Sequence, residues 1–307
     1  MLKEKYSYIL LVAANLIWGG NFVIGRAVGQ YIPPFTLSML RWLIAFLALS
    51  PFLYKRLRRD WGVLQKHKRI VAVLALTGIV GYNTLLYAAL HYTTSVNAAV
   101  LNAITPLCIA ALSVFLLKEK LASVQMAGIC LSVSGVLFTL SEGSWAKLQS
   151  LTFNSGDILV VLAVLCWGAY SVIGKKYANI LPAYTSLYVT AGLGVLVLLP
   201  FSVYELSRPG VRVIWAPFSV CVLLYVGLLA SIAAFLSWNL GVKHAGAAKA
   251  GVFLNLLPVF AVSFATLFAG ETLAWYQAVG GGVVIAGVLL SSFFAGKPTA
   301  QHMEKAG

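Results

Sequence analysis

The chain has 307 residues, of which 61% are hydrophobic and 10% are charged, and its mean hydropathy is +0.91. Soluble domains contain roughly 45–50% apolar and about 25% charged residues, so this composition excludes a soluble globular fold. The net charge of +14 would suit a nucleic-acid-binding protein, but the basic residues lie at predicted helix ends, which argues against nucleic acid and favours the lipid bilayer as the partner.

Apolar stretches long enough to cross a bilayer follow one another along the whole chain. A spanning helix needs about 20 mostly apolar residues, because the hydrocarbon layer is about 30 Å thick and a helix rises about 1.5 Å per residue. The stretches that qualify are residues 6–26, 34–54, 70–90, 95–117, 122–141, 156–175, 184–204, 216–240, 247–269 and 273–295. The sequence therefore predicts an all-α integral membrane protein with ten transmembrane helices.

The first predicted helix carries Asn15, Trp18 and Asn21 at membrane depth. Lys3 and Lys5 precede its apolar run, as in a signal peptide, but no small-residue cleavage site follows, so we expect the helix to stay attached. A buried polar group without a partner costs on the order of 1–3 kcal/mol. These side chains should therefore face other polar groups or a water-filled cavity that binds a substrate.

Arg41 in the second helix is the only charge well inside a predicted span. An intramembrane charge is a functional candidate by default, and a guanidinium would suit a substrate carboxylate or phosphate. A long side chain near a helix end also reaches the interface or binds loop carbonyls, and we favour this structural role.

Basic residues are distributed unequally between the two sides of the predicted helices. One side holds only Arg26, Lys147, Arg208 and Arg212, whereas the other holds the remaining Lys and Arg residues outside the spans, including the segment 55–69. Short cytoplasmic loops carry the excess of positive charge. We therefore expect a multi-pass protein of the cell (plasma) membrane with both termini in the cytoplasm.

The third and fourth helices add polar side chains to the same expected substrate cavity, namely Tyr82, Asn83, Tyr87 and Asn102. Pro106 lies within the fourth helix, where proline removes one backbone hydrogen bond and obstructs another, so a kink is expected there. The freed carbonyls would line a cavity, or the bend would serve gating, and a static kink is the alternative.

Comparison of the chain with itself reveals a repeat. At an offset of 149 residues, the matching positions include Trp18 with Trp167, Gly19 with Gly168, Pro33 with Pro182 and Thr36 with Thr185. At an offset of 152 they include Pro106 with Pro258, Glu119 with Glu271, Gln125 with Gln277, Gly128 with Gly280 and Gly135 with Gly287. Each repeat holds five helices, an odd number, so the second repeat (148–307) must be inverted relative to the first (1–147).

The segments Leu101–Leu137 and Phe253–Leu289 each resemble the end of an EamA repeat of the drug/metabolite transporter superfamily, and the Trp-Gly pairs at 18–19 and 167–168 are similar to its beginning. The resemblance covers nearly the whole chain. It implies a ten-helix carrier of amino acids, sugars or related small metabolites, often outward, and leaves the substrate open.

Glu119 and Glu271 lie at helix ends on opposite faces of the membrane, so they cannot share a proton site, and a structural role near the following helix N-terminus is expected. EamA repeats commonly cap the fifth and tenth helices with Thr or Ser. Alanine occupies both positions here, so Ser123 and Thr272 become the expected caps.

The second repeat supplies the other wall of the expected cavity. Its candidate substrate-binding residues are Trp167, Tyr170, Ser171, Trp238, Asn239 and Asn255, and Pro258 is its predicted kink. An amide and aromatic lining suits uncharged or zwitterionic metabolites with an apolar part, although such amides also simply join helices. The absence of a midplane carboxylate from the predicted spans argues against proton exchange for cationic drugs.

Glycines of the fifth and tenth helices, among them Gly128 and Gly280, permit close backbone approach. Packing within one protomer is the default expectation, and a homodimer contact is the alternative.

These features predict a secondary transporter that moves small metabolites by alternating access, with amino acids or related compounds and export favoured. A multidrug or sugar/nucleoside carrier of the same fold is the alternative. A channel-like facilitator is less favoured, because no filter loop or ring of charge is found. An enzyme is not expected, since the sequence shows no catalytic constellation, no metal-spaced cluster and no need for a cofactor.

Overall fold

The computed structural model describes residues 2–28, 31–89, 92–93, 95–150, 154–268 and 272–294, and every regular element within them is helical. Nine helical runs of this part of the chain are long and apolar enough to cross a membrane. In addition, α1 (Leu2–Val28) has 27 residues, or about 40 Å, and is also long enough. Large apolar side chains such as Phe115 and Phe268 stand on the outer surface, as expected of a surface that faces lipid. The prediction of an all-α membrane protein is confirmed.

The first half of the chain contains α1, α2 (Pro34–Lys66), the run α3 (Lys68–Leu74), η1 (Ala75–Gly81) and α4 (Tyr82–Ala89), the run α5 (Ser95–Ala103) and α6 (Thr105–Leu117), and α7 (Ser123–Leu140). A short helix, α8 (Trp145–Gln149), leads to the second half. That half contains α9 (Ser155–Tyr177), α10 (Ala183–Leu206), the run α11 (Pro217–Leu224), η2 (Tyr225–Ala233) and α12 (Ala234–Ala245), the run α13 (Ala247–Val252), η3 (Phe253–Asn255) and α14 (Leu256–Phe268), and the run α15 (Trp275–Leu289) and η4 (Leu290–Phe294). The elements η1, η2 and η4 are π-helical, and η3 is a 3-10 turn.

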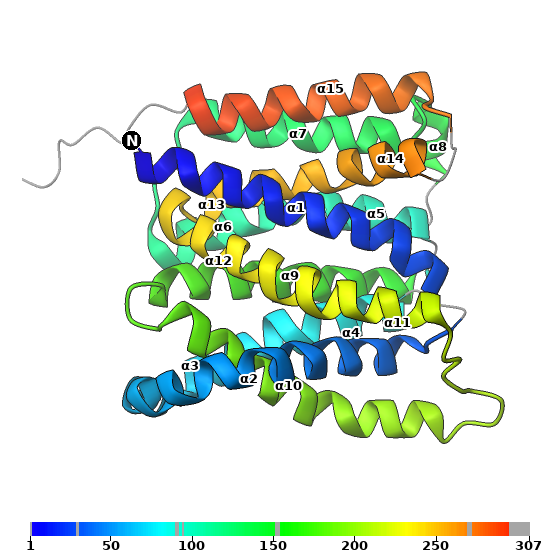
Figure 1. Cartoon of the computed structure of the whole chain (residues 1–307). Helices are drawn as coiled ribbons and strands as arrows, with labels where there is room; N and C mark the ends of the chain where they lie inside the picture. The colour runs from blue at the N-terminus through cyan, green and yellow to red at the C-terminus, as the bar shows by residue number, and fades with distance from the viewer. Residues whose placement is uncertain are drawn as a thin grey trace, which may run out of the picture.

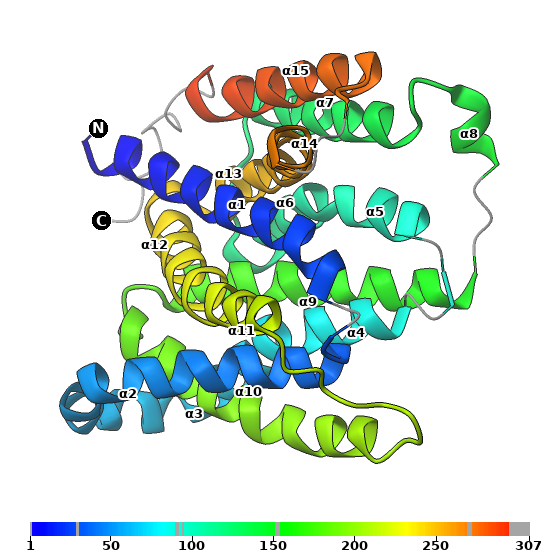
Figure 2. The same cartoon turned by 45° about the vertical axis from the view of Figure 1, so that its right-hand side comes forward.

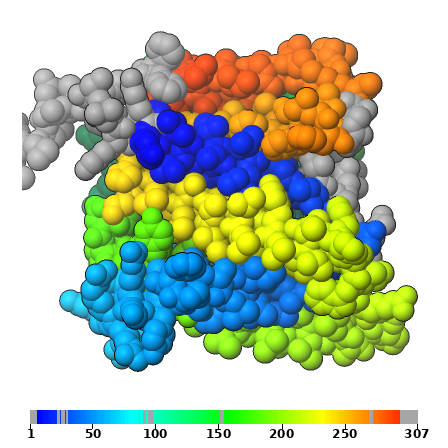
Figure 3. All heavy atoms as spheres, viewed as in Figure 1, coloured from blue at the N-terminus to red at the C-terminus, as the bar shows by residue number. Residues whose placement is uncertain are grey.

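Corresponding helices of the two halves of the chain make corresponding contacts. α2 packs along its counterpart α10, and α7 packs along its counterpart α15 (Figure 1). α1 packs against α12 and α14, just as α9 packs against α4 and α6. The α7–α15 pair lies at one edge of the bundle and the α2–α10 pair at the other (Figure 2). In the space-filling view, α1 lies between α12 and α14, which are distant from it in sequence (Figure 3).

Glycines set the distance between α7 and α15. A Cβ atom on Gly128 would lie 2.7 Å from the carbonyl oxygen of Gly287, and a Cβ atom on Gly135 would lie 2.7 Å from that of Gly280. The start of each helix thus meets the end of the other, so the two helices are antiparallel and in backbone contact. These glycines are used within the protomer, whereas Gly282 faces open space.

The second helix is longer than predicted. It was expected to end at residue 54 but continues to Lys66, so most of the basic segment 55–69 is helical. Leu64 of this extension is buried, and Asp60 accepts a hydrogen bond of 2.9 Å from the hydroxyl of Thr185 in α10. Hydropathy marks where the apolar composition ends, and a basic helix continues beyond that point when it packs against a neighbour.

Two carboxylates that the sequence analysis missed join α2 to α10. Glu205, near the end of α10, accepts hydrogen bonds from the backbone N–H groups of Phe35 at 3.2 Å and Thr36 at 2.8 Å, and from the Thr36 hydroxyl at 2.8 Å. It thereby caps α2, whose preceding residue provides no side-chain cap. At the other end, Asp60 of α2 binds Thr185 in the first turn of α10. Thr36 and Thr185 are repeat counterparts, so the two contacts are reciprocal.

The predicted caps of the fifth and tenth helices are wrong. Ala122 and Ala274 occupy the N-cap positions with extended backbone, so Ser123 already lies inside α7 and Thr272 precedes the cap of α15. At α15 the backbone N–H of Ala274 donates to Oε1 of Gln277 at 2.9 Å. The glutamine half of the capping box therefore operates without a hydroxyl at the cap.

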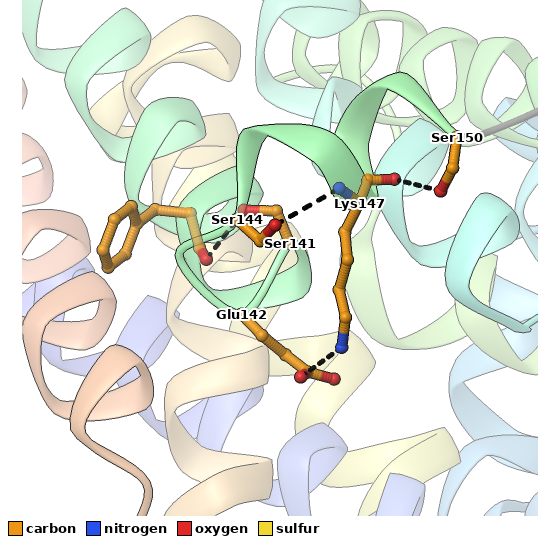
Figure 4. Close-up of polar contacts among 6 residues, drawn as sticks. Ser141, Glu142, Ser144, Lys147 and Ser150 are labelled. Carbon is orange, nitrogen blue, oxygen red and sulfur yellow. Dashed lines mark hydrogen bonds and ion pairs between the residues drawn. The ribbon is translucent and has the colours of Figure 1, made fainter.

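The two ends of the bundle differ in charge, and we call them the basic end and the opposite end. At the basic end, Nζ of Lys175 donates to the carbonyl of Lys243 at 2.6 Å and links α9 to α12. At the opposite end, Ile214 donates to the carbonyl of Tyr31 at 2.7 Å. The connection around α8, also at the opposite end, is held by an exposed ion pair of Glu142 with Lys147 and by local serine hydrogen bonds (Figure 4).

Candidate functional site

Aromatic side chains from both repeats meet at the centre of the bundle. Trp18 of α1 and its counterpart Trp167 of α9 pack edge to face, with ring centroids 5.4 Å apart. Trp238 of α12 lies 5.9 Å and 5.7 Å from them, and Phe235 lies 5.6 Å from each. Tyr170 lies 5.3 Å from Trp167. We call these five buried residues the aromatic cluster; four of them were candidates from the sequence, whereas Phe235 has no polar atom that distinguishes it from ordinary core.

Hydrogen bonding within the aromatic cluster departs from the symmetry of the repeats. Nε1 of Trp18 donates to the carbonyl of Ala230, within the π-helical η2, at 3.0 Å. The counterpart of Ala230 is Gly78 in η1, but Nε1 of Trp167 has no acceptor among the described residues. Nε1 of Trp238 also finds none in this part of the chain. A buried donor without a partner costs on the order of 1–3 kcal/mol, so both indoles are available to a bound solute or to water.

Phenylalanine substitutions should separate the two counterpart tryptophans. Trp18→Phe removes the donor to Ala230 and is expected to cost about 1 kcal/mol more in unfolding free energy than Trp167→Phe, because both variants lose similar ring area but only the first loses a hydrogen bond to the protein. Chemical unfolding of both variants in the same detergent measures this difference. Equal losses would contradict the asymmetry.

A second group of candidate residues lies between the aromatic cluster and the opposite end. The ring of Tyr82 is 5.4 Å from that of Trp167, and its hydroxyl donates to Oδ1 of Asn102 at 3.0 Å. Asn21 and Asn83 are half-buried. All four polar residues lie in the half of their span nearer the opposite end, and we call this group the approach to the aromatic cluster.

A similar tyrosine–asparagine bond lies on the side of the basic end. The hydroxyl of Tyr170 donates to Oδ1 of Asn239 at 3.0 Å and joins α9 to α12. Because Tyr170 also stacks near Trp167, this bond borders the aromatic cluster directly. One Tyr–Asn pair therefore flanks the cluster toward each end of the bundle.

Both candidate kink prolines lie just after an interruption of their helix. The run of α5 and α6 breaks at Ile104, and Pro106 follows in the first turn of α6. Proline has no N–H for the carbonyl of Asn102, and the hydroxyl of Thr105 donates to that carbonyl instead, at 2.5 Å. In the second repeat the 3-10 turn η3 precedes Pro258. The carbonyl freed in α5 is thus satisfied locally and does not line a cavity.

The two proline-containing spans pack together near the basic end. α6 contacts α13, where a Cβ atom on Gly251 would lie 3.3 Å from Cβ of Ile109. At the repeat offset of 152, Ile109 corresponds to Ala261 and Gly251 to Ala99, so the equivalent contact would join α5 to α14. Over the described residues, α5 and α14 show no comparable packing, and both alanines are half-buried. The two proline-containing spans are therefore packed together toward the basic end and not comparably toward the opposite end.

Three candidate side chains are not brought to the aromatic cluster by hydrogen bonds or stacking. Nδ2 of Asn15 and Oγ of Ser171 each donate to a backbone carbonyl of their own helix, at 2.8 Å and 2.9 Å. Nδ2 of Asn255, expected on the cavity wall, donates to a serine hydroxyl of α7 at 2.8 Å and joins two helices. The side chain of Tyr87 and the whole of Glu271 lie outside the described residues.

Arg41 is buried within the bundle, with 5% of its surface exposed. Its Nε donates to the hydroxyl of Ser231 in η2 at 2.8 Å, and its guanidinium lies 5.5 Å from the ring centroid of Trp42. It therefore tethers α2 to η2. The contact described for Nε is thus with a side chain of the π-helix, in keeping with a structural role for Arg41.

Glu119 lies half-buried in the turn between α6 and α7 at the basic end. Its carboxylate is 3.8 Å from the position that a Cβ atom on Gly246 would take, in the turn that joins α12 to α13. Burial raises the pKa of Glu119, and the ammonium group of Lys175 opposes this rise. The carboxylate is thus placed between two connections at the end of the bundle and away from the aromatic cluster.

Known proteins are similar to this chain in sequence and in fold. The model of the EamA-like transporter family matches residues 5–141 and 154–293. The uncharacterized transporter YyaM of Bacillus subtilis is 29% identical over 95% of either chain, and an uncharacterized transporter of Archaeoglobus fulgidus is 31% identical over 93% of this chain and 97% of its own. The uncharacterized inner membrane transporter YhbE of Escherichia coli is 25% identical over 92% of this chain and 90% of its own. A solved crystal structure with 22% sequence identity has the same fold, with a TM-score of 0.76 over 94% of this chain and 97% of its own. The chain therefore belongs to the EamA-like transporter family and is a multi-pass membrane transporter, not an enzyme.

Proposed function

We propose that the protein is a secondary transporter of small metabolites, with amino acids or related compounds as its substrates and export as its direction. The proposal rests on one observation above all. α6 packs against α13, whereas α5 and α14, which take the same places when the repeats are exchanged, do not pack comparably over the described residues. Two inverted repeats of five helices each (1–147 and 148–307) that exchange these arrangements would open a central site to one side and then to the other. The antiparallel contact of α7 with α15 supports the inversion.

The lining of the centre supports the choice of substrate class. The aromatic cluster offers apolar rings and two unpaired indole donors, and Asn21 and Asn83 offer amides on one side of it. Acidic residues of the described chain, such as Asp157 and Glu205, lie near helix ends. This arrangement suits uncharged or zwitterionic solutes with an apolar part and argues against exchange of protons for cationic drugs.

The charge distribution supports an orientation in the plasma membrane. Excess Lys and Arg at the basic end would place this end, and both termini, in the cytoplasm. The approach past Asn21 and Asn83 would then face outward. In this orientation Pro106 and Pro258 lie in the two spans whose relative tilt must change, which is our reason for assigning them a gating role.

Pairs of cysteines test the exchange of conformations, in a background that lacks Cys108, Cys130, Cys166 and Cys221. The pair Ile109→Cys with Gly251→Cys should form a disulfide readily, because a separation of 3.3 Å between Cβ positions is close to the roughly 3.5–4.5 Å of natural disulfides. The counterpart pair Ala99→Cys with Ala261→Cys should form one only when the opposite end closes. We expect each disulfide to stop transport in proteoliposomes and reduction to restore it. Failure of the counterpart pair to form while transport continues would contradict the exchange.

The substrate class is tested by uptake into proteoliposomes of amino acids, sugars, nucleosides and cationic drugs, with and without a pH gradient. Uptake of amino acids or their close relatives supports the proposal. Preferential uptake of drugs, sugars or nucleosides would favour the alternative carriers of the same fold, and passage of ions alone would favour a channel-like facilitator. The mass of the purified protein in nanodiscs of defined size, measured by light scattering, separates a monomer from a homodimer.

A further inference from the structure

A small cavity opens at the basic end, apart from the approach at the opposite end. It lies between α3, α9, α10 and α12 and has a volume of about 60 Å³. Lys243 and Tyr177 line its outer part, and Tyr170 and Asn239 line its inner part. Its wall on α10 runs from Ala183 to Thr190, about 10 Å along the helix. The inner end is thus the Tyr170–Asn239 bond that borders the aromatic cluster.

This cavity contains hydrogen-bond donors that the described residues leave without an acceptor. Ser186 is 8% exposed, and its hydroxyl has no partner in the described part of the chain. Oδ1 of Asn239 accepts the hydroxyl of Tyr170, which leaves the amide nitrogen as a donor. The hydroxyl of Thr190 is already used by a carbonyl of its own helix. A buried hydroxyl that lines a cavity and has no partner is free to donate a hydrogen bond to a group bound there.

The charge around this cavity is positive. Lys243 lines it, and its carbonyl holds the ammonium group of Lys175, so two lysines lie together at the mouth. Glu119 interacts with Lys175 and balances one of the two charges. The other nearby acid, Asp60, is bound by Thr185, which does not line the cavity.

The start of α10 adds to this positive potential. The residues of α10 that line the cavity are Ala183, Ser186, Leu187 and Thr190, which follow the spacing of one helix face. Pro182, at the N-cap, provides no side-chain cap. A helix N-terminus carries a partial positive charge and favours anions, here in addition to the unpaired hydroxyl and the lysine.

From these groups we infer that the cavity binds the carboxylate of a solute at the basic end, before the solute passes the Tyr170–Asn239 bond. The site rests on the proposed transport function and names the class of substrate, an amino acid or a related compound that carries a carboxylate. Ser186 and the amide of Asn239 bind the carboxylate oxygens, and Lys243 supplies the charge. A volume of about 60 Å³ holds roughly four water-sized groups, so the cavity receives the carboxylate and a short apolar stem along Leu74.

Propionate and propionamide, which have the same shape and differ in charge, test this site in the full-length protein in nanodiscs by saturation-transfer NMR titration. Propionate should bind at least tenfold more tightly than propionamide. Ser186→Ala and Lys243→Gln should each weaken propionate binding about tenfold, the effect of losing one hydrogen bond or contact with a charged group. Lys243→Gln leaves the backbone carbonyl that binds Lys175 in place.

Matched controls distinguish this cavity from general effects on the protein. Ser113→Ala removes another buried hydroxyl that has no partner in the described chain, but one in α6 outside the cavity, and Lys176→Gln removes an exposed neighbouring charge. Both should leave the affinity for propionate within twofold. Because Ser186→Ala removes an unpaired group, it should fold normally, as size-exclusion chromatography will check.

Equal affinity for propionamide would overturn the carboxylate preference, and equal effects of Ser186→Ala and Ser113→Ala would overturn the location. The test is independent of the proposed function. If the wild-type protein binds propionate selectively but transports no solute, this result counts against the transport proposal. If Ser186→Ala and Lys243→Gln lose selective binding but take up substrate at unchanged rates, the cavity does not lie on the transport route.

Discussion

Replacement of Glu205 by alanine is expected to lower the free energy of unfolding by about 3 kcal/mol. The side chain is buried and accepts three hydrogen bonds, two from backbone N–H groups at the start of α2 and one from the Thr36 hydroxyl. Alanine would leave these donors without the partner that the first turn of a helix needs. Each lost bond to a charged group is worth roughly 1.5–3 kcal/mol, and the losses add incompletely because the three bonds share one carboxylate.

Unfolding of the purified protein by a denaturing detergent measures this effect, with Glu142→Ala as the control. Glu142 also forms an ion pair near a helix end, but it is exposed, and such pairs contribute about 0–1 kcal/mol (Figure 4). Glu205→Gln should fall between the wild type and Glu205→Ala, because an amide oxygen still accepts but carries no charge. Equal losses for Glu205→Ala and Glu142→Ala would show that α2 does not need this cap.

The packing of α7 against α15 could have been predicted from the sequence. Gly128 and Gly135 have counterparts at Gly280 and Gly287, with the same spacing of seven residues. When two such helices cross about a twofold axis, each first glycine must meet the second glycine of its counterpart, as the structure shows. Only the repeat offset and the helical period are needed for this deduction.

The reciprocal contacts of α2 with α10 could not have been predicted from the sequence. Glu205 lies in no motif, and its partner Thr36 is 169 residues away, so only the tertiary packing brings them together. The one available signal was the repetition of Thr36 at Thr185. The length of α2 was missed for a similar reason, because its basic extension is stabilised by contact with α10 and not by an apolar composition.

The candidate site was predicted in part. Trp18, Trp167 and Trp238 were identified because large amphipathic side chains at membrane depth need a common environment, and they do meet. Asn255 follows the same reasoning but faces α7, because the rotation of a helix about its axis is set by packing that hydropathy does not encode. The unpaired hydroxyl of Ser186 was likewise invisible in the sequence, where one serine in an apolar span resembles any other.

Replacement of Gly287 by alanine is expected to cost about 3 kcal/mol of unfolding free energy, a second large effect. The added methyl would lie 2.5 Å from the backbone nitrogen of Ser132 and 2.7 Å from the carbonyl oxygen of Gly128. No rotamer change relieves a clash with backbone, so α7 and α15 must move apart, and overpacking of this kind typically costs 1–3 kcal/mol. Gly282→Ala on the same helix is the control, since nothing lies within 4 Å of its Cβ position, and it should be neutral or stabilising.

A double substitution then distinguishes contact between the two helices from an effect on one helix alone. A methyl on Gly128 would also fall between the two backbones, 2.7 Å from the carbonyl of Gly287. If Gly287→Ala acts by forcing the helices apart, the space opened by the first methyl accepts the second, and the double variant costs clearly less than the sum of the single ones. Additive losses in unfolding experiments would mean that each alanine strains its own helix independently. Because this pair lies at the edge of the bundle, away from Trp18 and Trp167, the folded fraction of each variant should retain the transport rate of the wild type.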